Sequence, residues 1–134
     1  MKFEDLYVGQ TASSSKTFGE ADVLLFAGVS TDCNPLHISA TAAEKGMFGQ
    51  RVCHGMLVAS LISAVLGTKL PGEGTVYMGQ NLQFRRPVYL GTTITATVTV
   101  KELNAEKHIA ILDTICTNEE GVAVIKGEAT VMLK

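Results

Sequence analysis

The chain has 134 residues, of which 46% are hydrophobic and 18% are charged, and its formal net charge is −2 at pH 7. This length predicts a single domain over residues 1–134 with one packed core. The balanced charge excludes the broad basic field that nucleic acids or anionic membranes require. Residues 1–6 contain no apolar signal segment, and the longest apolar run, residues 56–66, is shorter than the roughly 20 residues of a membrane span. We therefore expect a cytoplasmic protein with neither membrane nor nucleic-acid partners.

The N-terminal half of the chain predicts helices. Thr17–Glu20 has the spacing of a capping box and predicts a first helix that runs to about Val29. Pro35 disfavours helix at Asn34 and predicts a turn, and residues 40–45 predict a short second helix. The principal helix is expected from His54 to Leu66, with Gly67 as its left-handed C-cap. It has no charged face, which indicates a helix enclosed by protein.

The C-terminal half predicts strands. Four apolar residues from Ile94 to Val100 alternate with four threonines from Thr93 to Thr99, the period of a half-buried strand. Residues 108–117 and 122–133 predict two further strands around a turn at 118–121. Residues 76–88 predict another extended stretch, bent at Gly79 or ended by Pro87. One buried helix facing an antiparallel sheet that curls around it is an α+β arrangement.

An acid–base pair stands on either side of the Asn34–Pro35 turn. Asp32 and His37 are five residues apart, and the turn can fold their side chains toward one point. A carboxylate and an imidazole around one water molecule can supply both a base and an acid near neutral pH. Loop aspartates and histidines also form ordinary structural hydrogen bonds, and the spacing leaves both interpretations open.

The start of the principal helix is a second candidate site. It has no Ser, Thr, Asp or Asn at its N-cap, so its first amides lack a side-chain acceptor. Free amides at a helix start can stabilise a developing oxyanion, and Gly55 has no Cβ to keep a carbonyl away. The alternative is that Gly55 only allows close packing between helix and sheet. His54, before it, is expected to be structural, bonding the loop that precedes the helix.

Three sequence blocks resemble those of MaoC-like proteins and fall in that family's order. They are Phe26–His37 with Ala43, which resembles the hydratase-2 signature, Gly46–Leu57, and Asn81–Val88 with Gly91. The length is similar to that of short bacterial R-specific enoyl-CoA hydratases of the kind that supplies polyhydroxyalkanoate synthesis. One departure is Thr31, where the signature usually has glycine before the aspartate. The resemblance implies a single hot-dog fold, with a long central helix wrapped by an antiparallel sheet.

The resemblance also implies roles for individual residues. Asp32 and His37 match the catalytic dyad that holds and activates water. Gly55 matches the position whose backbone N–H polarises the thioester carbonyl. Asn34 matches a residue that supports the dyad or its water. Ser63 matches a hydroxyl that lines the site, although a helix serine bonded back to a carbonyl is an equal alternative.

These roles imply a hydro-lyase that converts trans-2-enoyl-CoA into (R)-3-hydroxyacyl-CoA without a cofactor. The alternatives are a (3R)-hydroxyacyl-carrier-protein dehydratase, a hot-dog acyl-CoA thioesterase and a non-catalytic acyl-CoA binding module. The resemblance also implies a homodimer. Four cations are candidates for the CoA phosphates, namely Arg51, Lys69, Arg85 and Arg86. No metal is expected, because Cys33, His37, Cys53 and His54 do not have the spacing of zinc sites, and Cys116 makes an odd third cysteine, so the thiols are expected to be reduced.

Overall fold

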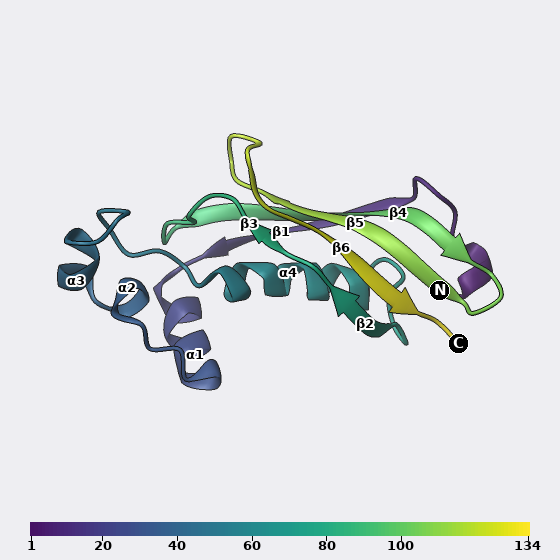
Figure 1. Cartoon of the computed structure of the whole chain (residues 1–134), viewed down its shortest axis with the longest axis horizontal. Coiled ribbons are helices and arrows are strands. Elements are labelled where there is room, and N and C mark those ends of the chain that lie inside the picture. Colours follow the sequence, from purple (N-terminus) through teal and green to yellow (C-terminus); the bar gives the residue numbers. More distant parts are fainter.

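An antiparallel sheet curls around one long helix in the computed structural model, which describes residues 1–134 (Figure 1). The sheet has the order β1 (Thr11–Phe18), β4 (Thr92–Asn104), β5 (Ile109–Thr117), β6 (Ala123–Met132) and β2 (Val76–Gln80). A sixth strand, β3 (Gln83–Phe84), also pairs with β6. The register shifts between Val100 and Glu102 in β4 and between Tyr77 and Gly79 in β2. Such irregularities increase twist and bend a strand, which suits a sheet that wraps a helix.

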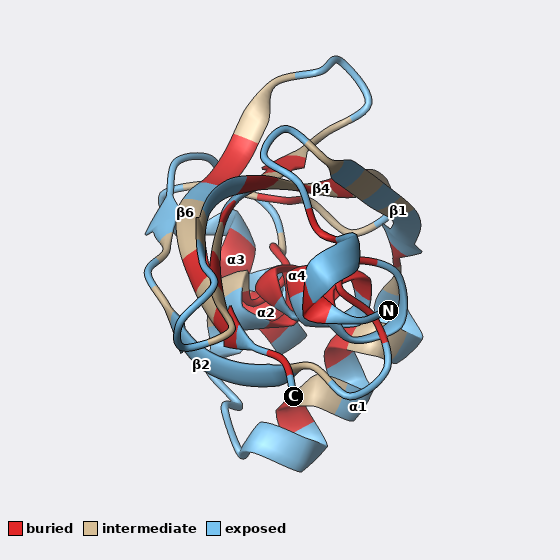
Figure 2. Cartoon of the chain, turned by 90° about the vertical axis from the view of Figure 1, so that its right-hand side faces the viewer, coloured by how far each residue is buried: buried red, intermediate tan, exposed pale blue.

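The helix inside the sheet is α4 (Gly55–Thr68). Its buried side chains form much of the core: Leu57, Val58, Ala59, Leu61, Ile62, Val65 and Leu66. Figure 2 shows this helix inside the curved sheet. The α+β prediction is thus confirmed. The predicted enclosure is incomplete, because one stripe of α4 that includes Met56, Ser60 and Ser63 is exposed.

The predicted end of the helix was wrong. Gly67 lies within α4, and the C-cap is Lys69, whose φ of −124° is not left-handed. The left-handed glycine of this region is Gly72, with φ of 92°. The chain therefore turns two residues later than the glycine and proline pattern indicated.

The alternating pattern of β4 sorts its side chains onto two faces. Ile94, Ala96 and Val98 are fully buried against the helix side of the sheet. The intervening threonines face outward, where Thr93 pairs with Thr17 at 2.6 Å and Thr95 with Ser15 at 2.7 Å through their hydroxyl oxygens. These hydroxyl pairs link β4 to β1, a strand that the sequence pattern did not predict, because its Thr11–Phe18 stretch is mostly polar.

Helices at one end of the sheet carry the rest of the N-terminal half. They are α1 (Glu20–Ser30), α2 (Pro35–Ile38) and α3 (Ala40–Glu44), and a short 3-10 helix spans Phe3–Asp5. The predicted cap at Thr17 was wrong, because Thr17 belongs to β1. The N-cap of α1 is Gly19, whose N–H donates to the Asp22 carboxylate at 2.9 Å. No helix of this chain has the length and apolar content needed to cross a membrane.

Candidate active site

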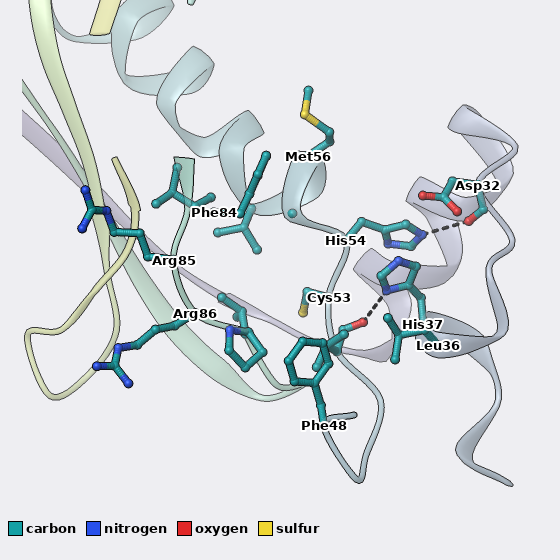
Figure 3. Close-up of a pocket in the computed structure, with 16 residues that line it drawn as sticks. Asp32, Leu36, His37, Phe48, Cys53, His54, Met56, Phe84, Arg85 and Arg86 are labelled. Carbon is teal, nitrogen blue, oxygen red and sulfur yellow. Dashed lines mark hydrogen bonds between the residues drawn. The ribbon is translucent and has the colours of Figure 1, made fainter. Parts of the chain in front are cut away.

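A cavity of about 410 Å³ opens where α4 begins. Its wall combines the loop after α1, α2, the first turn of α4 and the segment after β3 (Figure 3). The lining is mostly apolar, with Asp32, His37 and His54 gathered on one side and Arg85 and Arg86 on the other (Figure 3). The full set of lining residues is Asp32, Leu36, His37, Phe48, Val52, Cys53, His54, Gly55, Met56, Val58, Phe84, Arg85, Arg86, Pro87, Val88 and Ile125. An apolar cavity with a few converging polar groups is the usual form of a small-molecule site.

The turn predicted at Asn34–Pro35 brings Asp32 and His37 together. Asn34 is the N-cap of α2, and its side chain accepts the Leu36 N–H at 3.1 Å. The Asn34 N–H donates in turn to one Asp32 carboxylate oxygen at 3.2 Å. A carboxylate oxygen of Asp32 and ring nitrogens of His37 and His54 lie within 4.8 Å of one another. Asn34 does not itself line the cavity.

The tautomer of His37 follows from its hydrogen bond to a backbone carbonyl. Its Nδ1 lies 2.8 Å from the Val52 oxygen, which can only accept, so Nδ1 carries the hydrogen and donates. In that tautomer, Nε2 keeps a lone pair and has no protein partner. His37 is 9% exposed, so packing and this bond together hold the ring. The free Nε2 can accept a proton from water or return it.

Gly55 is the first residue of α4, and no side chain caps the helix. The N-cap residue is His54, whose ring points away from the first amides to bond the Asp32 carbonyl. Phe84 lies over the glycine, since a Cβ built on Gly55 would meet the Phe84 ring at 2.6 Å. Both alternatives for Gly55 are therefore compatible with the structure, because close packing and a free amide occur at the same residue.

Ser63 lies on the exposed stripe of α4 and does not line the cavity. It is also not among the serines bonded back to a helix carbonyl, as Ser60 is to Leu57 at 2.5 Å. Its assignment as a site hydroxyl stays a prediction, and contact with substrate would require the uncovered stripe to face a bound molecule or another chain.

Two of the four candidate cations, Arg51 and Lys69, bond other groups and do not line the cavity. The Arg51 guanidinium bonds the Glu20 carboxylate at 2.6 and 3.1 Å and also the His37 carbonyl oxygen at 2.7 Å. Lys69 donates to the Ser13 carbonyl oxygen at 2.6 Å. Arg85 and Arg86 line the cavity and are exposed, and Arg85 also donates to the side-chain oxygen of Gln83 at 2.9 Å. Only these two arginines are placed to meet a charged group at its mouth.

Both the sequence and the fold of this chain have counterparts among known proteins. Residues 7–122 match the model of the MaoC like domain. An (R)-specific enoyl-CoA hydratase from Rhodospirillum rubrum is 52% identical over 98% of this chain and 90% of the relative. The chain belongs to the MaoC-like family. The solved structure of an (R)-hydratase from Aeromonas caviae has a TM-score of 0.95 and 45% identity over 98% of this chain and 99% of that chain. R-hydratase PhaJ1 from Pseudomonas aeruginosa has a TM-score of 0.93 and 42% identity over 98% of this chain and 84% of that chain.

Membership of the MaoC-like family confirms the resemblance described above and, with the solved structures, the hot-dog fold. It also confirms the expected enzyme class, a hydro-lyase. In this MaoC-like chain the wall of the cavity includes several residues to which no role in the site was assigned from the sequence, among them His54 and Phe84. His54 could have been found from its place directly before an uncapped helix. Phe84 has no local signal, because only the tertiary fold brings β3 over α4.

The cysteines have no part in the cluster of possible ligands, which consists of Asp32, His37 and His54. Cys53 lines the cavity, and burial raises the pKa of its thiol to about 11, with a further rise from Asp22. At neutral pH this thiol is protonated and is neither a nucleophile nor a thiolate ligand. The polar chemistry of the cavity therefore depends on the carboxylate, the imidazoles and the backbone amides.

Proposed function

We propose that this protein hydrates trans-2-enoyl-CoA to (R)-3-hydroxyacyl-CoA, with Asp32 and His37 as the catalytic dyad. The observation that carries the proposal is the convergence of the two side chains on one cavity, with His37 Nε2 free. Hydration of an enoyl thioester needs a water held by a base and a proton source for C2. One Asp32 carboxylate oxygen accepts the Asn34 N–H, and the second is free to accept a hydrogen bond from water.

The thioester carbonyl would bind at the amides of the first turn of α4, led by Gly55. These N–H groups have no side-chain acceptor, and the positive end of the helix dipole adds to their effect. Polarisation of the carbonyl makes C3 electrophilic, so the water held by the dyad attacks C3. The negative charge that forms on the carbonyl oxygen is stabilised there, and the proton that the dyad removed from the water is then delivered to C2.

The test is the rate of crotonyl-CoA hydration by Asp32→Asn and His37→Asn. The second change keeps a donor near the position of Nδ1, for the Val52 carbonyl, and removes Nε2. We expect kcat to fall by about 10²–10⁴-fold in each, the usual range for acid–base groups. Asp113→Asn and His108→Asn make the same chemical changes outside the cavity and serve as controls. Near-native rates in both dyad variants would end the proposal. Thiol release without hydration would favour a thioesterase, and binding without turnover a non-catalytic module.

Arg85 and Arg86 are the proposed contacts for the CoA phosphates, since they lie at the cavity and no carboxylate pairs with either. Arg86→Gln should raise KM for crotonyl-CoA about two- to fivefold, the value of an exposed ion pair of about 0.5–1 kcal/mol. The KM for a pantetheine thioester, which lacks those phosphates, should not change, and Lys126→Gln is the control. A variant that loses activity only on carrier-protein substrates would favour the dehydratase alternative.

The proposed assembly is a homodimer. β2 is an edge strand of the sheet, and its residues Val76, Tyr77 and Met78 are exposed. Met56 on α4 is 57% exposed although it is apolar. Unpaired edges and apolar side chains in water favour association with a second copy. Sedimentation equilibrium should give twice the chain mass, and Met78→Lys should shift the equilibrium toward the monomer. A monomeric wild-type protein would contradict this assembly.

A further inference from the structure

His54 lies between the two members of the proposed dyad. Its side chain is 2% exposed, and its Nε2 lies 2.9 Å from the backbone oxygen of Asp32. Its ring stacks on the His37 ring with the centroids 3.9 Å apart and the planes inclined by 28°. Figure 3 shows the bond to the Asp32 carbonyl and the two rings together. One side chain thus contacts the backbone of Asp32 and the ring of His37.

The chemistry of this ring is determined by its two nitrogens. The Asp32 carbonyl can only accept, so Nε2 carries the hydrogen and donates. Nδ1 is buried and has no hydrogen-bond partner. A buried polar atom without a partner lowers stability, and an apolar ring of similar shape would avoid that loss. The bond made by Nε2 is therefore the feature that distinguishes histidine from phenylalanine at this position.

The segment that His54 contacts comprises residues 31–34, and its other hydrogen bonds are local. Thr31 has a φ of 65°, a left-handed conformation that is costly for a β-branched residue. Residues 31–34 form their other hydrogen bonds with one another or with neighbours between residues 26 and 37, as in the bond from the Asp32 N–H to Ser30 Oγ. The His54 bond is the one hydrogen bond that joins this segment to a distant part of the chain.

We propose that His54 is a positioning residue for the hydration reaction. Its Nε2–H holds the backbone of Asp32 at the start of α4, and its ring supports the face of His37. The next residue is Gly55, whose amide is proposed to bind the thioester carbonyl. His54 therefore sets the position of the carboxylate relative to both the imidazole and the helix start. This inference rests on the proposed function, and it assigns His54 no contact with the substrate.

The test compares three substitutions that keep different parts of the side chain. His54→Gln places an amide donor near the position of Nε2, His54→Asn places one only near Nδ1, and His54→Phe keeps a ring without a donor. We expect the glutamine variant to keep kcat for crotonyl-CoA within about threefold. The other two should lose about 10–100-fold in kcat with little change in KM, the usual effect of misplaced catalytic groups.

Thermal unfolding and the Ile94→Val variant separate positioning from stability. Ile94 is fully buried in β4, so this change lowers Tm without touching the site, and kcat should stay at the wild-type value. Equal kcat in the glutamine and asparagine variants would overturn the proposal, because these two differ in whether the amide reaches Asp32. A wild-type rate in the phenylalanine variant would also overturn it. An inactive wild-type protein would instead refute the proposed function.

Discussion

The ring of Phe84 covers the Cα of Gly55, so closely that a Cβ on the glycine would lie 2.6 Å from two ring carbons. Phe84 belongs to the two-residue strand β3, and Gly55 begins α4. The contact thus joins the sheet to the helix start at the proposed thioester site. It explains the need for glycine there in steric terms.

Gly55→Ala should reduce kcat for crotonyl-CoA by about tenfold or more, because the methyl group must displace the Phe84 ring beside the proposed oxyanion amide. Stability should change less, since alanine is favoured over glycine in a helix by up to about 1 kcal/mol. The double variant Gly55→Ala/Phe84→Leu should recover part of the activity if the clash is the cause. Steady-state rates and thermal unfolding of wild type, Gly55→Ala, Phe84→Leu and the double variant check this. Equal losses in the single and double variants would contradict it.

Thr31→Gly should raise the free energy of unfolding by about 0.5–1 kcal/mol. A left-handed conformation costs a non-glycine residue about 1–2 kcal/mol, and the flexibility of glycine in the unfolded chain cancels part of that gain. Urea denaturation measures the change. Thr41→Gly, within α3, is the matched control and should lower stability by a few tenths of a kcal/mol, roughly the difference in helix propensity between the two residues. A lower free energy of unfolding in Thr31→Gly would show that the threonine side chain stabilises the fold by more than its left-handed backbone conformation destabilises it.

Asp22→Ala should lower the free energy of unfolding by about 1 kcal/mol at pH 7, the usual value of a helix cap. The Gly19 N–H and then the Lys16 ammonium lower the pKa of the Asp22 carboxyl. A lowered folded-state pKa stabilises the fold above the unfolded pKa of about 3.9, and this stabilisation is lost as pH falls through the folded value.

Denaturation of wild type and Asp22→Ala at pH 7, 5 and 3 measures that dependence. The difference in the free energy of unfolding between the two proteins should be constant from pH 7 to 5 and should become smaller at lower pH. Glu106→Gln, in the exposed turn between β4 and β5, is the control and should have little effect. A difference that persists unchanged in strong acid would rule out the carboxylate as its source.

Alkylation at pH 8 should label Cys33 alone in the folded protein. Cys33 is exposed, whereas Cys53 and Cys116 are buried. Burial raises the pKa of Cys53 to about 11 and that of Cys116 to about 12, so both thiols are protonated at that pH and react slowly. Mass spectrometry should find one label per native chain and three in urea, with none on native Cys33→Ser. Rapid native labelling of Cys53 would contradict its burial.

The buried thiols also predict a loss of stability in alkali. A thiol whose folded pKa is raised stabilises the fold below the unfolded pKa of about 8.5, and this contribution declines as pH rises toward the folded value. The loss should therefore begin near pH 9 and continue to about pH 11 for Cys53. Cys53→Ala should flatten this part of the pH dependence measured by urea denaturation. If stability fell as steeply with rising pH in Cys53→Ala as in wild type, groups other than Cys53 would be the cause of the loss.

Local pattern in the sequence was sufficient for the elements whose hydrophobic period is strong. The alternation in Ile94–Val100 placed β4 because apolar residues at every second position can face only one side of a sheet. The apolar run after His54 predicted α4, because a helix without a charged face must be covered by other parts of the protein. Polar β1 was not predicted, because its place depends on hydroxyl pairs with β4 that are remote in sequence.

For the candidate site, the sequence by itself determined the residue types, the Asn34–Pro35 turn and the uncapped helix start. The tertiary structure alone decided that His54 bonds Asp32 and stacks on His37, that Phe84 covers Gly55, and that Arg51 is engaged by Glu20. These contacts join residues from 17 to 31 positions apart. A turn or a helix cap is encoded by neighbours, whereas contacts over such separations exist only once the sheet has closed around α4.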